Sequence, residues 1–156
     1  MQRLAQSNLA DARRRLQVAR DVFQEEAYHF SVRLCQEAVE LALKAALRYV
    51  NVDPPKWHDV GEILLQNAHK FPDWFRRDLK RLAAVSKELR GERELSMYGD
   101  EERGMPAEEL YGEKEAIEAV QGAEQVLAAC EKLIMEEEIE AAPEGEITPE
   151  EGADAA

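Results

Sequence analysis

Four side chains suited to holding a phosphate group or moving a proton lie close together in the sequence. They are Lys87, Arg90, Arg93 and Tyr98. A guanidinium group forms bidentate, charge-assisted hydrogen bonds to phosphate oxygens. A tyrosine phenol has an ordinary pKa of about 10, which makes it a poor general base near neutral pH. Lys87, Arg90 and Arg93 are therefore candidate ligands of a phosphate group, and Tyr98 is a weak candidate for moving a proton.

Each of these residues also has a simpler interpretation. Arg93 continues the register of a buried helix face, so it is either a phosphate ligand in a cleft shared by two protomers or a surface residue where the helix frays after Gly91. Tyr98 is either a remnant catalytic residue or an aromatic side chain that packs the following loop. The basic stretch that precedes them consists of Arg76, Arg77, Lys80, Arg81, Lys87 and Arg90. It could attract nucleotide or RNA phosphates, but Asp78 and Glu88 interrupt it, which favours a solvated helix face.

Other chemistry is missing from the sequence. There is no glycine-rich phosphate loop, no Ser/His/Asp order and no paired Glu-x-x-His motif of a di-metal bundle. Cys35 and Cys130 fall in apolar-periodic segments and are predicted to be small buried side chains. The three histidines, His29, His58 and His69, lack the spacing of a zinc site. We therefore expect no metal, no cofactor and no self-sufficient metabolic enzyme.

The elements that must position the four residues are helical. Apolar residues recur at spacings of three and four over residues 2–24, 28–51, 59–70, from 72 onward, and over 113–138. Glycines and a proline over 98–112 indicate a loop. The fold class is therefore all-α, an up-and-down bundle of about five helices. The helix over 28–51 is apolar on two sides, which is more surface than a small monomer is expected to cover and predicts a homodimer.

The charge of the chain is concentrated at its end. The net charge is −13, and residues 136–156 contain nine acidic residues and no basic one. Such a segment has too little apolar area to offset its ordering entropy. We predict a bundle over residues 1–138 and a disordered acidic tail over 139–156. No apolar run is long enough to span a membrane and no signal peptide is evident, so we expect a cytoplasmic protein without a membrane partner.

Four sequence motifs together resemble one known family. They are Gln36-Glu-Ala-Val-Glu-Leu-Ala-Leu-Lys-Ala45, Lys56-Trp-His-Asp-Val60, Arg93 to Asp100, and Glu109-Leu-Tyr-Gly-Glu113. In order and spacing they resemble the HEPN domain (higher eukaryotes and prokaryotes nucleotide-binding), in its prokaryotic stand-alone type, over roughly residues 2–135.

The resemblance implies a small helical bundle, usually a homodimer. It often pairs with a minimal nucleotidyltransferase in a toxin–antitoxin-like module. Active members are similar to metal-independent ribonucleases with an arginine followed, after four to six residues, by a histidine. Here Arg93 matches the arginine, but Tyr98 stands at the histidine position. Because histidine shuttles protons near neutrality and tyrosine does not, the prediction is a non-catalytic subunit that binds nucleotide or RNA or assembles with a partner. The alternative is an RNase-like effector.

Overall fold

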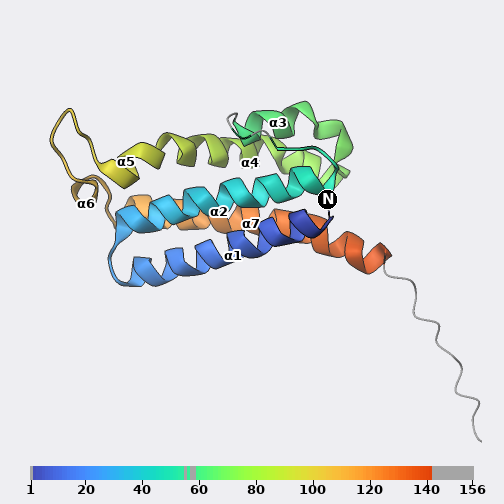
Figure 1. Cartoon of the computed structure of the whole chain (residues 1–156), viewed down its shortest axis with the longest axis horizontal. Coiled ribbons are helices and arrows are strands. Elements are labelled where there is room, and N and C mark those ends of the chain that lie inside the picture. Colours follow the sequence, from blue (N-terminus) through green and yellow to red (C-terminus); the bar gives the residue numbers. More distant parts are fainter. Residues whose placement is uncertain (1, 55, 57–58, 142–156) are drawn as a thin grey trace, which may run out of the picture.

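The computed structural model describes the backbone of residues 2–54, 56 and 59–141, and side chains as far as Met135. Within this part four long helices lie side by side along the long axis of the molecule (Figure 1). They are α1 (Gln2–Gln24), α2 (Tyr28–Tyr49), α4 (Asp73–Gly91) and α7 (Glu113–Ala141). The described residues form no β-strand, only an isolated bridge between Asp100 and Met105. The predicted all-α bundle is confirmed.

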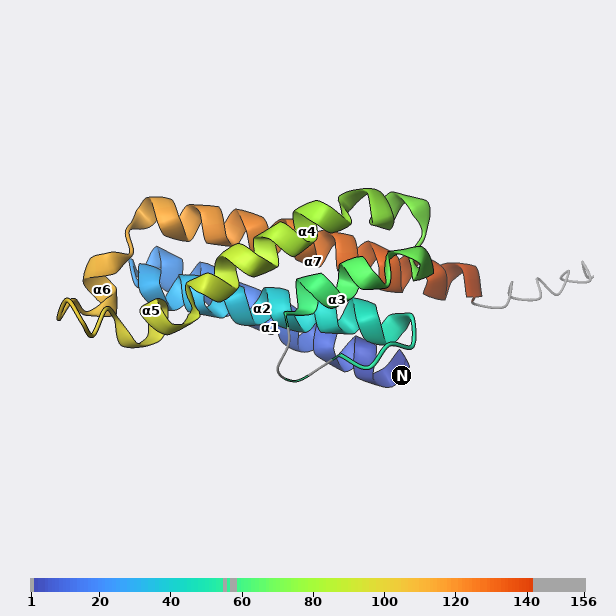
Figure 2. The same ribbon diagram turned by 90° about the horizontal axis from the view of Figure 1, so that it is seen from above.

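The short elements lie at the two ends of the bundle, as Figure 2 shows. They are α3 (Val60–Gln66), the 3₁₀ turn η1 (Ala68–Lys70), α5 (Arg93–Tyr98) and α6 (Ala107–Leu110). Asp59 caps α3 by accepting a hydrogen bond from the Gly61 amide at 3.0 Å, the predicted cap. The predicted helix over 59–70 is interrupted at Asn67, whose side-chain amide donates to the Ile63 carbonyl at 2.8 Å. The predicted loop over 98–112 contains the single turn α6.

The core is built around α2. Both of its apolar faces are almost entirely buried, against α1 and α7 on one side and the α3–α5 segments on the other. A single chain thus covers this helix by itself. This corrects the prediction that its two apolar faces need a second copy for their burial, and the homodimer must be argued from other surfaces.

The predicted boundary between the bundle and the acidic tail lies near the end of α7. The helix α7 extends to Ala141, three residues past the predicted bundle boundary at residue 138. Residues 142–156, most of the predicted tail, lie outside the described residues. In the described part of the chain, no helix combines the length and apolar composition needed to cross a bilayer.

Candidate functional site

Three cationic side chains line one pocket of about 250 Å³ on the α2–α4 side of the bundle. They are Arg90 at the end of α4, Arg93 at the start of α5, and Lys56 in the connection after α2. The other described lining residues are Gln36, Glu40, Val60 and Ser86. The pocket therefore joins three cations, one carboxylate, an amide and a hydroxyl.

The α4–α5 wall of the pocket follows from helical spacing. Ser86, Arg90 and Arg93 stand at i, i+4 and i+7, which places them on one side of a helix. The helix is broken between the two arginines, because α4 ends at Gly91 and Glu92 caps it. The chain re-enters a helix at once, and Ser96 anchors the new turn through its hydroxyl to the Arg93 carbonyl at 3.1 Å. The break therefore keeps Arg93 beside Arg90.

The opposite wall is a pair of polar residues on α2. Gln36 donates a hydrogen bond to the Glu40 carboxylate at 3.0 Å, and Lys44 pairs with the same carboxylate at 3.2 Å. The charge of Glu40 is thereby balanced by a lysine on its own helix. Among the described residues, no carboxylate lies within ion-pairing distance of Arg90, Arg93 or Lys56. The pocket has a surplus of positive charge and can accept an anion such as a phosphate group.

Comparison with known proteins identifies the family of the chain. The sequence model of the HEPN domain matches residues 5–133. The chain belongs to the HEPN domain family. Among solved structures, this HEPN domain is similar to the crystal structure of TT1696 from Thermus thermophilus, with a TM-score of 0.68 and 25% identity over 85% of this chain and 98% of that one. Among proteins with curated descriptions none matches.

The HEPN motif positions are separated in space although they share a helix. Arg93 lines the pocket, whereas Tyr98 is not among the lining residues and its side chain is 65% exposed. Five residues along an α-helix correspond to a rotation of about 140°, so the two side chains leave α5 in different directions. The expectation that Tyr98 packs the following loop is wrong for the single chain.

Lys87 is not brought to the pocket either. It lines a groove between α3 and α4 together with Lys80. Of the predicted binding residues, the structure therefore brings together Arg90 and Arg93 and leaves Lys87 on the neighbouring surface. Sequence reasoning missed Gln36, Glu40, Lys56 and Ser86. Gln36, Glu40 and Lys56 lie in motifs that resemble the family, but no role in binding was assigned to them, and Ser86 was noted only in the apolar register of its helix.

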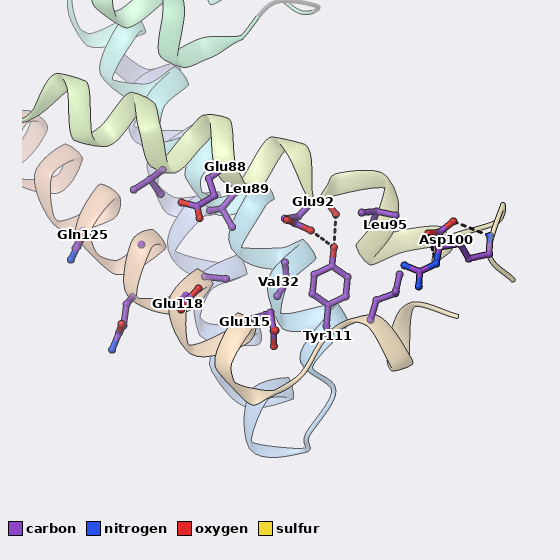
Figure 3. A pocket seen from close by; sticks show the side chains of 16 residues that line it. Val32, Glu88, Leu89, Glu92, Leu95, Asp100, Tyr111, Glu115, Glu118 and Gln125 are labelled. Carbon is purple, nitrogen blue, oxygen red and sulfur yellow. Dashed lines mark hydrogen bonds and ion pairs between the residues drawn. The ribbon is translucent and has the colours of Figure 1, made fainter. Parts of the chain in front are cut away.

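A second cavity of about 530 Å³ lies between α4, α5 and α7 (Figure 3). Its floor is apolar, and its rim carries five acidic side chains but only one basic one. The charged residues are Glu88, Glu92, Asp100, Glu115, Glu118 and Arg103. Tyr111 donates its hydroxyl to the Glu92 carboxylate, and burial together with this carboxylate raises the pKa of the phenol. The charge of this cavity disfavours anions, whereas that of the arginine pocket favours them.

The two thiols offer no nucleophile. Cys35 and Cys130 are both buried and free, as predicted. Burial raises the pKa of Cys35 to about 12, with Glu124 adding to the effect, and burial likewise raises the pKa of Cys130. Since the thiolate is the reactive form, neither residue is available for covalent chemistry near neutral pH.

Proposed function

We propose that this HEPN protein is a non-catalytic binding and assembly subunit that holds a nucleotide phosphate in the pocket of Lys56, Arg90 and Arg93. We further propose that it acts as a homodimer and pairs with a minimal nucleotidyltransferase in a two-gene, toxin–antitoxin-like module. The observation that carries the proposal is the convergence of these three cations, none paired with a carboxylate among the described residues, on one pocket.

The non-catalytic part of the proposal rests on proton transfer. Cleavage of RNA through its own 2′-hydroxyl needs a group that takes one proton and returns another near neutral pH. Among the residues that the structure describes, the pocket lining contains no histidine. Its carboxylate, Glu40, is engaged by Lys44 and Gln36. These groups support binding better than turnover.

One observation favours the alternative, a metal-independent ribonuclease. Tyr98 at the end of α5 is 65% exposed, so its hydroxyl is open to a substrate. The two functions are separated by the Tyr98 variants considered in the Discussion.

The binding proposal is tested by measuring the affinity for ATP by calorimetry in wild-type and substituted protein. Removing Arg93 deletes a charged hydrogen bond to phosphate, worth about 1.5–3 kcal/mol. We expect Arg93→Ala to weaken ATP binding by about tenfold to a hundredfold, and Arg90→Ala to weaken it in the same direction. Arg14→Ala on α1 is the matched control, since Arg14 is exposed and outside the pocket.

The outcome against the proposal is equally clear. If wild-type protein does not bind ATP, or if Arg14→Ala weakens binding as much as Arg93→Ala does, the pocket is not a nucleotide site. Circular dichroism spectra of all variants verify that the substitutions leave the bundle folded.

A further inference from the structure

The outer face of α4 carries a group of cations that the phosphate pocket does not use. This cationic face consists of Arg77, Lys80, Arg81 and Lys87. All four are exposed, and none has an ion-pair partner among the described residues. Their neighbour Arg76 differs, because it pairs with Asp73. Asp78 and Glu88 are exposed on the same helix, but none of the four cations of this face pairs with either of them.

A groove beside two of these cations can accommodate an extended segment of chain. This groove of about 450 Å³ runs between α3 and α4, with Lys80 and Lys87 on its edge. The floor of the groove is made of small residues, among them Gly61 and Ala83. These two residues pack closely, because a β-carbon added at Gly61 would lie only 3.1 Å from the α-carbon of Ala83. The exposed Leu65 borders the same groove. Asp59 and Glu62 of the α3 side line the groove opposite the two lysines, so the excess positive charge of the face comes from Arg77 and Arg81, and Leu65 adds some apolar contact.

The end of α7 lies at the same end of the bundle as the start of α4, as both ribbon views show (Figures 1 and 2). The ammonium group of Lys132 on α7 lies 4.3 Å from the ring centre of Trp74 on α4. From there α7 continues to Ala141, about 14 Å further along its axis. Residues 142–156 follow, and 15 residues reach at most about 50 Å. Lys87 lies only about 20 Å along α4 from Trp74, so the whole cationic face is within reach.

We propose that residues 142–156 dock on this cationic face of α4 within the same chain. The segment carries five acidic residues and no basic one, namely Glu144, Glu146, Glu150, Glu151 and Asp154. Its charge is thus complementary to the four cations. Covalent attachment holds it at an effective concentration on the order of millimolar, so weak individual pairs suffice.

The basic helix α1 is a poorer docking surface. Three of its arginines already have partners: Arg13 pairs with Glu131, Arg15 with Glu37, and Arg20 with Glu124. Only Arg3 and Arg14 are left without an ion pair among the described residues. The cationic face of α4 offers twice as many unpaired charges and a groove beside them.

The test is zero-length carbodiimide cross-linking of the full chain, read by mass spectrometry. It needs no nucleotide, so its result is independent of the proposed phosphate site. We expect the distal acidic residues of the segment, Glu150, Glu151 and Asp154, to be linked to Lys80 and Lys87. The reference is Lys114, an exposed lysine at the opposite end of α7, which should remain unlinked. NaCl at 1 M, which shortens the Debye length to about 3 Å, should reduce the yield several-fold.

Two paired variants decide which surface holds the segment. Arg77→Gln with Arg81→Gln keeps both reporter lysines and should lower the yield of their cross-links several-fold. Arg3→Gln with Arg14→Gln on α1 should leave that yield unchanged. Equal linking to Lys114, loss of the cross-links only in the α1 variant, or links found only between differently isotope-labelled chains would each overturn the proposal.

Discussion

Arg93 lies where a helix breaks, and this position gives it two properties that rarely occur together. Its backbone carbonyl is held by Ser96, so the base of the side chain is fixed. Its guanidinium lines a pocket and has no carboxylate partner among the described residues. An unpaired guanidinium is free to form bidentate hydrogen bonds to a phosphate group. Tyr98, on the same short helix, does not line this pocket.

The exchange Tyr98→His tests whether the rest of an RNase site is present. The wild-type protein is expected to show no RNA cleavage without metal. Tyr98→His restores a group that titrates near neutrality, and acid–base catalysis contributes about 10²-fold or more. Position 98 lies outside the arginine pocket of its own chain, so cleavage of an RNA oligonucleotide should appear in Tyr98→His only where a second copy of the chain brings this side chain to its Arg93. The cleavage should then be lost again in the double variant with Arg93→Ala. Robust wild-type cleavage that is abolished by Tyr98→Phe would contradict this expectation and make the effector function correct.

The candidate site was only half visible in the sequence, for a physical reason. Arg90 and Arg93 belong to one helical face, and helical spacing brings them together without further information. Lys56 comes from a connection and Gln36 from another helix. Their approach depends on how α2 and α4 pack, which no local spacing specifies. Lys87 was grouped with the arginines because it is near in sequence, but its place on the turn directs it to the α3 groove.

At the scale of elements, the end of α5 depends on a single glycine. Gly99 has a φ of 73°, and a β-carbon there would clash with the Met105 carbonyl oxygen. Two segments of the chain meet at this point, where Asp100 and Met105 exchange backbone hydrogen bonds of 2.8 and 3.0 Å. The loop after α5 can therefore close only because residue 99 has no side chain.

The substitution Gly99→Ala should consequently destabilise the protein. A strained backbone of this kind costs about 1–3 kcal/mol, which corresponds to a fall in melting temperature of about 2–12 °C for a chain of this size. Gly104→Ala is the matched control: its φ is 65°, but nothing lies within 4 Å of an added β-carbon. Thermal unfolding should thus show a smaller loss for Gly104→Ala, and equal losses would show that the contact with Met105 is unimportant.

Helices with a long, regular repeat of apolar residues were predicted well. The positions at which helices break were not predicted. α1, α2 and α7 begin within a residue or two of the predicted positions because the core selects their apolar faces. The break at Asn67 arises from a side chain that binds its own helix. The break at Glu92 coincides with a hydrogen bond from Tyr111, 19 residues further on. Neither hydrogen bond can be predicted from the periodic spacing of apolar residues.

At the scale of the whole molecule, the burial of α2 removes one argument for a dimer, but apolar side chains exposed elsewhere provide another. The two apolar faces of α2 are covered within one chain. α5 and the start of α2 lie at the same end of the bundle (Figure 1). Large apolar side chains are still exposed at this end. Phe30 is 37% exposed, Leu95 39% and Tyr98 65%. An interface at this end would cover these residues and bring two copies of Arg93 toward each other.

We therefore expect a homodimer that depends on this end of the bundle. Light scattering at tens of micromolar should give twice the mass of the chain. Placing a charge in an apolar interface costs more than the contact gains, so Phe30→Glu and Leu95→Glu should each shift the mass to that of a monomer. Leu65→Glu is the matched control, because Leu65 is 43% exposed but lies on α3, away from α5. A monomer in the wild type would contradict the dimer. A dimer that only Leu65→Glu dissociates would place the interface on α3, and the arginine pockets of the two copies would then not be shared.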